Sequence, residues 1–302
     1  MMSGHVRFRG AALLVGTALL ATACGAGTAP GTSGDTPAVV AAVYPLQWLS
    51  EQVGGSDVKV SGLTSPGVEP HDAELGPQQM ADLQSSVLTV YIKGLQPAVD
   101  DAVAGEAKGF DAASAVQVLE GEHHEDDGHG HEAPTDPHIW LDPSRLARVA
   151  TQLGDRLAAA APEQAQGFKD RAAATSAALT ALDEEMADGL AQCAGKSLVT
   201  SHEAFGYLAD RYRLKQVGIT LDPESEPSPA RIAEVAKIAR AEKVSTVFTE
   251  SLASPKVAEV LASEVGAKTA ALDPLESKPA SGDYLSAMRA NLATLRTALG
   301  CT

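Results

Sequence analysis

The chain has 302 residues, of which 39 are acidic and 23 are lysine or arginine, so its net charge is −16 at pH 7. This acidity argues against nucleic acid as a partner. The length is sufficient for one large domain or two modest ones, each able to bury its own core.

Residues 1–23 have the pattern of an export signal. Arg7 and Arg9 form a charged start, and residues 11–20 form an apolar stretch too short to span a bilayer as a stable helix. The small residues 21–23 precede Cys24, as in a bacterial lipoprotein signal. We therefore expect Cys24 to be the lipidated first residue of an extracytoplasmic protein anchored to the cell membrane. The alternative is cleavage at another bond, with Cys24 incidental.

Residues 24–36 carry almost no apolar bulk and predict a flexible tether. The folded part is expected to start near Pro37. No later apolar stretch approaches the length of a membrane span, so the sequence predicts a soluble body.

Short apolar runs alternate with amphipathic stretches in residues 37–142, which we predict to be an amino-terminal lobe. The predicted strands are 39–43, 58–63, 87–92 and 116–119. The predicted helices between them are 46–53, 78–84 and 97–104. Such alternation is typical of a parallel sheet covered on both faces.

A second unit of the same kind is predicted in residues 193–302. Its expected strands are 197–200, 215–219, 244–248 and 269–272, and its expected helices are 204–213, 229–242, 255–265 and 284–299. Residues 143–192 are rich in good helix formers, with Pro162 as the break, and predict a short helix followed by a long one. The predicted fold class is α/β, with two four-stranded, mainly parallel sheets joined by a rigid backbone helix.

Two cysteines remain after the signal, Cys193 and Cys301. An even pair in an exported protein can oxidise, and we expect a disulfide that ties the last helix back to residue 193. Two separate buried thiols are the alternative.

A histidine-rich tract, residues 120–132, interleaves four histidines with acidic residues and glycines; they are His123, His124, His129 and His131. Imidazole and carboxylate groups on a loose backbone can bind zinc, nickel or copper in many geometries. The tract suits an accessory, low-affinity metal loop better than a defined site. A solvated charged loop or a cloning remnant is the alternative.

Four further residues stand at predicted strand ends or in stiff loops: His71, His138, His202 and Asp273. Each alone reads as a surface, capping or turn residue. Together they place two ligands on each lobe at the edge where parallel sheets bind ligands. Three imidazoles and one carboxylate form a four-coordinate set suited to zinc, with no open hydrolytic position. Nearby partners that could orient the imidazoles are Asp72, Glu203 and Glu250.

The segments around these residues read G-V-E-P-H, D-P-H-I-W-L-D-P, S-H-E-A-F-G-Y, L-D-P-E-S-E-P-S-P and L-D-P-L. As a set, in this order, they resemble the zinc and manganese solute-binding proteins of bacterial ABC importers, over essentially all of residues 39–302. The resemblance implies two α/β lobes that hold a metal ion at His71, His138, His202 and Asp273. Histidine at position 202, where manganese binders have glutamate, and the acidic histidine-rich loop both imply the zinc branch. Glu69 or a water molecule remains an alternative to Asp273.

The resulting hypothesis is a monomeric receptor that captures Zn²⁺ and delivers it to the permease of an ABC transporter, without catalysis. A receptor for manganese or other divalent metals, and a zinc-buffering or adhesive surface lipoprotein, are the alternatives. A zinc hydrolase is disfavoured, because Gly206 stands where the H-E-x-x-H motif begun at His202 would need its second histidine.

Overall fold

The computed structural model describes residues 36–120, 135–221 and 223–301. The predicted signal, Cys24, the tether and the four histidines of the tract lie outside these residues. In the described part, no helix combines the length and apolar character that a membrane span needs.

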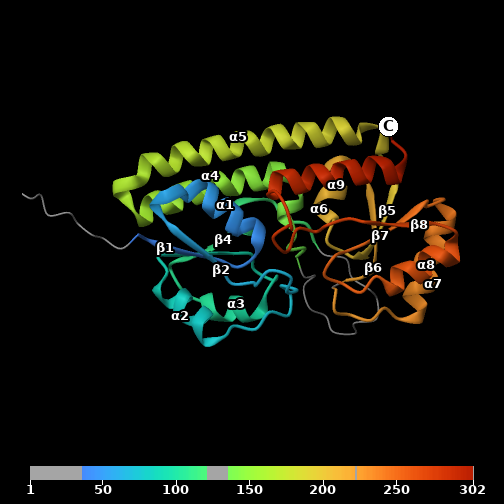
Figure 1. Cartoon of the computed structure of the whole chain (residues 1–302), viewed down its shortest axis with the longest axis horizontal. Coiled ribbons are helices and arrows are strands. Elements are labelled where there is room, and N and C mark those ends of the chain that lie inside the picture. Colours follow the sequence, from blue (N-terminus) through green and yellow to red (C-terminus); the bar gives the residue numbers. More distant parts are fainter. Residues whose placement is uncertain (1–35, 121–134, 222, 302) are drawn as a thin grey trace, which may run out of the picture. The chain divides into compact units, whose positions relative to one another are not determined.

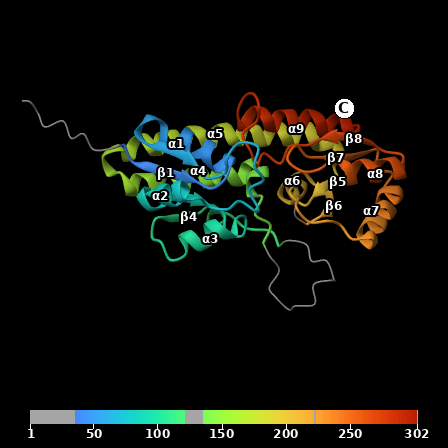
Figure 2. The same ribbon diagram turned by 60° about the horizontal axis from the view of Figure 1, so that its bottom comes forward.

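The first sheet has the strand order β2-β1-β3-β4, and all neighbouring strands are parallel. Its strands are β1 (Ala38–Ala41), β2 (Lys59–Gly62), β3 (Leu88–Tyr91) and β4 (Gly109–Asp111). The helices that alternate with them are α1 (Tyr44–Gly54), α2 (Pro77–Ser85) and α3 (Pro97–Val103). Figures 1 and 2 show α2 and α3 on one side of this sheet and α1 on the other.

Alternation along β1 explains the two layers. Val39 and Ala41 belong to the main apolar core, whereas Val40 and Ala42 belong to a separate cluster with Leu83 of α2 and Val99 of α3. Successive side chains of a strand point to opposite faces, so a fully buried strand needs helices on both sides.

The second sheet repeats this topology with the order β6-β5-β7-β8, again parallel throughout. Its strands are β5 (Ser197–His202), β6 (Lys215–Thr220), β7 (Thr246–Thr249) and β8 (Lys268–Ala271). Its helices are α6 (Gly206–Tyr212), α7 (Pro229–Ala241), α8 (Lys256–Val265) and α9 (Tyr284–Leu299). The predicted fold class is thereby confirmed.

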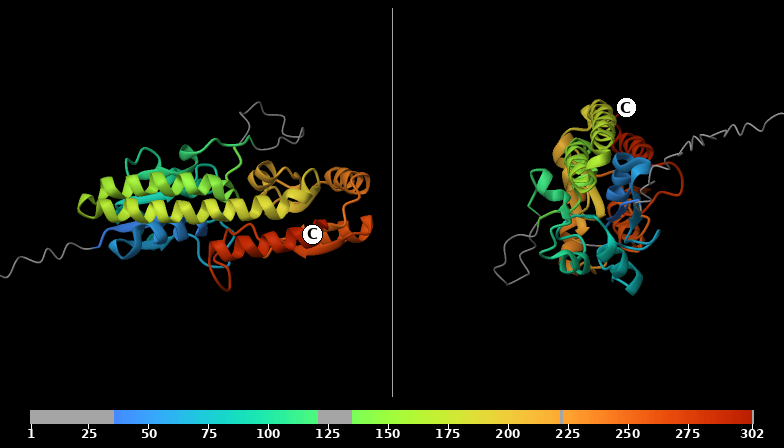
Figure 3. Two further views of the ribbon diagram at one scale, coloured as in Figure 1. Left: turned by 90° about the horizontal axis from the view of Figure 1, so that it is seen from above. Right: turned by 90° about the vertical axis from the view of Figure 1, so that its left-hand side faces the viewer.

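Two long helices join the sheets, α4 (Pro143–Ala160) and α5 (Ala165–Leu190). The Asp142 side chain caps α4 by accepting from the backbone N–H groups of Ser144 and Arg145. After the turn at Pro162–Gln164, α5 runs back along α4, and it also packs against α1 of the first unit and α9 of the second (Figure 3). The long linking helix is therefore part of both lobes.

One apolar core runs through both lobes as a consequence. It contains Phe110 of the first sheet, Leu179 of α5 and Phe248 of the second sheet. The indole of Trp48 on α1 stacks on Tyr284 of α9, with 4.9 Å between ring centroids. Burial on this scale holds the two sheets to a common framework.

A disulfide joins Cys193, after α5, to Cys301, after α9. It confirms the predicted pairing. Both cysteines are buried against the main core, so the bond fastens the ends of two helices that already pack together.

One predicted strand is wrong. Residues 116–119 form no strand, and the fourth strand of the first sheet is β4, which lies earlier and pairs with β3. Gly109 and Asp111 are poor strand formers, so β4 exists because of its neighbour rather than its own propensity.

Candidate metal centre

His71 lies in the loop that follows β2. Gly67 in this loop has a φ of +79°, a conformation that glycine adopts without steric cost. The Glu69 carboxylate accepts a hydrogen bond from the backbone N–H of His71 at 3.2 Å. The loop thus turns back on itself and presents the imidazole.

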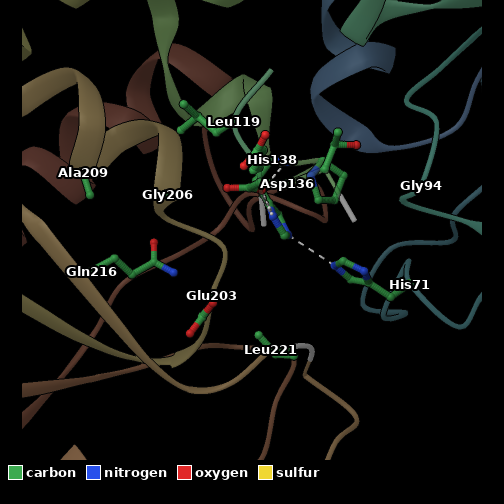
Figure 4. A pocket seen from close by; sticks show the side chains of 13 residues that line it. His71, Gly94, Leu119, Asp136, His138, Glu203, Gly206, Ala209, Gln216 and Leu221 are labelled. Carbon is green, nitrogen blue, oxygen red and sulfur yellow. Dashed lines mark hydrogen bonds and ion pairs between the residues drawn. The ribbon is translucent and has the colours of Figure 1, made fainter. Parts of the chain in front are cut away.

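His138 immediately precedes a single 3-10 turn, Ile139–Leu141, whose three side chains are fully buried. Asp136 accepts hydrogen bonds from the backbone N–H of His138 at 2.9 Å and from its Nδ1 at 2.8 Å. This arrangement fixes the tautomer with the proton on Nδ1, so Nε2 is free to bind. Figure 4 shows Asp136 beside His138, and His138 directed at His71.

His202 is the last residue of β5 and is fully buried. Glu250, which follows the neighbouring strand β7, accepts from the His202 backbone N–H at 3.1 Å and from Nδ1. Connections leave β5 and β7 in opposite directions along the sheet, and ligands bind at such switch points. Here too the carboxylate leaves Nε2 as the open ligand atom.

Glu276 lies between β8 and α9 and is 1% exposed. Its Oε1 is 3.4 Å from His71 Nε2, 3.3 Å from His138 Nε2 and 3.4 Å from His202 Nε2. The His71 and His138 Nε2 atoms are 3.3 Å apart. Four buried or half-buried ligand atoms from four segments therefore converge on one point.

These separations match the edges of a small tetrahedron. A zinc ion with bonds of about 2.0 to 2.1 Å holds tetrahedral ligands about 3.3 to 3.4 Å apart. Within the described residues, His71, His138, His202 and Glu276 are the one group whose ligand atoms all lie within 4.8 Å of one another. The geometry and the three-nitrogen, one-oxygen donor set both fit Zn²⁺.

Electrostatics also favour a cation at this point. Burial alone would lower the pKa of His202, but the hydrogen bond to Glu250 and the adjacent carboxylate of Glu276 raise it to about 10. Burial likewise opposes protonation of His138, whose pKa is raised overall by Asp136 and Glu276. Burial would raise the pKa of Glu276, yet the three imidazoles hold it well below its usual value. Without metal, the site attracts protons to His138 and His202 while the carboxylate of Glu276 stays ionised.

The structure brings the three predicted histidines together but does not bring Asp273 into the group. Asp273 lies three residues earlier, at the start of the same segment, and its Oδ1 accepts from the backbone N–H of Leu275 at 2.8 Å. Glu276 was missed because nothing in L-D-P-L-E-S marks its glutamate above the aspartate at the strand end. Glu69 lies nearby; burial, followed by the neighbouring Glu276 charge, raises its pKa to about 7.

Of the expected orienting residues, Glu250 holds His202 as predicted, whereas Glu203 accepts from Arg231 at 3.2 Å. The partner of His138 is Asp136, which the sequence interpretation did not single out. The D-P-H stretch could have indicated this pairing, because an aspartate two residues before a histidine can accept hydrogen bonds from both its backbone N–H and its ring.

A pocket of about 440 Å³ opens beside the site between the two lobes (Figure 4). Its lining includes His71, His138, Gln216 and the two described residues that flank residues 121–134, Glu120 and Thr135. Those flanking residues form an isolated antiparallel bridge. The described residues on either side of 121–134 therefore lie beside the metal centre.

The protein has two α/β lobes, each built on a parallel sheet, and a buried cluster of three histidines and one carboxylate between them. These features place it in the class of two-lobed metal-binding proteins. Residues 39–298 match the family model described as the periplasmic component A of a zinc-uptake complex. The chain belongs to this family.

Several relatives support the assignment. The zinc-binding lipoprotein AdcA of Streptococcus pneumoniae is 36% identical in an alignment of 276 positions that covers 85% of this chain and 55% of AdcA. The chain thus spans about half the length of such relatives. The high-affinity zinc uptake system protein ZnuA of Bacillus subtilis is 32% identical over 93% of this chain and 94% of its own.

A similar solved structure is the laminin-binding protein of Streptococcus agalactiae, described as bifunctional with adhesin and metal-transporting activity. It has a TM-score of 0.78 and 29% identity over 87% of this chain and 99% of its own. The fold is therefore shared along nearly the whole of that protein.

Proposed function

We propose that this protein is an extracytoplasmic receptor that binds one Zn²⁺ between its lobes and delivers it to an ABC permease. The observation that carries this proposal is the convergence of three imidazole nitrogens and one carboxylate oxygen at tetrahedral spacing. We propose His71, His138, His202 and Glu276 as the ligands.

Support for transport rather than catalysis comes from the ligand count. A catalytic zinc keeps one position for water or substrate, whereas four protein ligands fill the coordination sphere. The names of the relatives, zinc-binding lipoprotein and zinc uptake protein, point the same way. We further propose that Cys24 carries the lipid that keeps the receptor at the membrane.

Support for zinc over manganese comes from the donor atoms. Imidazole suits zinc, whereas manganese favours sites richer in oxygen and of higher coordination number. The site offers three nitrogens to one oxygen.

Metal analysis of untagged protein, followed by calorimetric titration, tests the proposal. We expect one tightly bound zinc ion per chain, and we expect zinc to displace manganese at equal concentrations. His202→Ala should weaken binding at least about 100-fold, because it removes a buried ligand and leaves Glu250 without its partner. Glu69→Gln is the matched control and should bind zinc nearly as the unchanged protein does.

A preference for manganese would contradict the assignment of the metal. An unchanged dissociation constant for His202→Ala would contradict the assignment of the site.

A further inference from the structure

The segment 273–277 between β8 and α9 carries Glu276 into the centre of the protein. Within the described residues, neither carboxylate oxygen of Glu276 has a regular hydrogen-bond donor, and the groups around it are the three imidazoles. Burial costs a carboxylate its hydration, and the imidazoles offset that cost only while the carboxylate points at them. The backbone before it must therefore hold its direction.

That backbone contains an unusual conformation. Leu275 has a φ of +60°, in the left-handed region that side chains other than glycine, asparagine and aspartate rarely adopt. Its side chain is fully buried in the main apolar core. The left-handed residue reverses the chain, so the side chain that follows it points at the histidines.

Asp273 is the residue that holds this turn. Its Oδ1 accepts from the Leu275 N–H at 2.8 Å, the contact of an aspartate with the backbone two residues on. Asn291 of α9 fixes Asp273 in turn: its Oδ1 accepts from the Asp273 N–H at 3.1 Å and its Nδ2 donates to the Asp273 carbonyl at 2.6 Å. The Asp273 carboxylate is thus engaged with the backbone.

The same segment is tied to both ligand loops of the first lobe. Trp140, two residues after His138, donates from Nε1 to the Pro274 carbonyl at 2.7 Å. Gly67, in the His71 loop, donates its N–H to Ser277 Oγ at 2.8 Å. The turn held by Asp273 therefore fixes the position of Glu276 relative to both His138 and His71.

We propose that Asp273 is a positioning residue: it stabilises the left-handed turn at Leu275 that aims Glu276 at the metal, and it does not bind the metal itself. This inference rests on the proposed function, because it takes Glu276 as a ligand. Without the Asp273 acceptor, Leu275 can return to negative φ, and the Glu276 carboxylate is no longer directed at the metal position.

Substitutions at position 273 separate the two roles. Asparagine keeps the Oδ1 acceptor and forms the same turn, serine forms a weaker one, and alanine forms none. A metal ligand would follow another order, since all three replacements remove the carboxylate charge that zinc binds. The turn role therefore ranks asparagine with aspartate, whereas the ligand role ranks it with alanine.

The experiment measures zinc dissociation constants by chelator competition for Asp273→Asn, Asp273→Ser and Asp273→Ala. We expect Asp273→Asn to bind nearly as tightly as the unchanged protein, Asp273→Ala to bind about 10- to 100-fold more weakly, and Asp273→Ser to lie between them. The absorption bands of bound Co²⁺ should be unchanged in Asp273→Asn and altered in Asp273→Ala, which general destabilisation would not produce.

Glu276→Gln is the control that keeps the two proposals apart. If Glu276→Gln binds zinc as tightly as the unchanged protein, the proposed ligand set fails. If Glu276→Gln loses affinity and Asp273→Asn loses as much, with altered Co²⁺ bands, the positioning role is overturned. The asparagine and serine variants decide the matter even if Asp273→Ala does not fold.

Discussion

Two of the three imidazoles of the site, those of His138 and His202, are paired with carboxylates through the ring nitrogen that faces away from the cluster. Asp136 holds Nδ1 of His138, and Glu250 holds Nδ1 of His202. Such pairs fix the ring and increase the basicity of the ligand nitrogen. The same pairing attracts protons when metal is absent, so zinc and protons compete for the same atoms.

Zinc binding should therefore release protons at neutral pH. The pKa of His202 is about 10, so this ring carries a proton in the metal-free protein at pH 7.5, whereas zinc binds the neutral ring. The pKa of His138 is shifted in the same direction. We expect affinity to rise as pH increases toward 10. Calorimetric titration in two buffers of different ionisation enthalpy measures the release, and an enthalpy independent of buffer would contradict it.

The stability of the metal-free protein should depend on pH, and the contributions of the histidine and of the carboxylate change with pH in opposite directions. The raised pKa of His202 contributes stability that is fully present below its unfolded value of 6.5 and is lost as pH rises toward about 10. The lowered pKa of Glu276 contributes stability present above 4.5 and lost as pH falls through its folded pKa. Both contributions are complete only between pH 4.5 and 6.5.

At this scale the structure brings together the three histidines that the sequence singled out, and Glu276 lies with them where Asp273 was expected. His71, His138 and His202 stand at strand ends or before a stiff apolar turn, where the fold class alone predicts convergence. Asp273 has the same signature. A left-handed leucine cannot be seen in a sequence, and it is Leu275 that moves the inward-facing carboxylate three residues on, to Glu276.

At the scale of elements, the alternation of strands and helices was sufficient to predict both sheets and their parallel sense. It failed at β4, where Gly109 and Asp111 have little strand propensity and the strand is ordered by pairing with β3. The stretch 116–119 looked more strand-like because it is apolar. Val118 is nevertheless exposed, so apolar character there does not report burial in a sheet.

The disulfide between the ends of α5 and α9 should be a source of stability that is independent of the metal. Cys193 and Cys301 are 108 residues apart, and opening so long a loop costs about 2 to 5 kcal/mol of unfolding free energy. Denaturant unfolding of Cys301→Ala/Cys193→Ala in a chelator measures this loss without the contribution of bound zinc.

Zinc affinity of the same double variant is the control. It should be nearly unchanged, because the apolar core still packs α5 against α9. No loss of stability would contradict the structural role of the bond.

At the scale of the whole molecule, one apolar core contains residues of both sheets and of the helices that join them. Trp140 and Tyr284 lie at its centre: the Tyr284 hydroxyl donates to the Trp140 carbonyl, and the Trp140 indole donates to Pro274. His138 lies two residues before Trp140, and Glu276 lies two residues after Pro274. The framework that joins the lobes therefore also sets the spacing of the ligands.

The central claim is a tetrahedral zinc ion bound by three imidazoles and one carboxylate oxygen. X-ray absorption of the zinc-loaded protein tests it most directly, on a variant lacking residues 121–134, so that the four histidines of the tract cannot contribute. The account predicts one zinc per chain with four ligands at about 2.0 to 2.1 Å, three of them imidazoles. The account would be contradicted by fewer than three imidazole ligands or by a six-coordinate ion. It would also be contradicted if the variant that lacks residues 121–134 no longer bound zinc tightly.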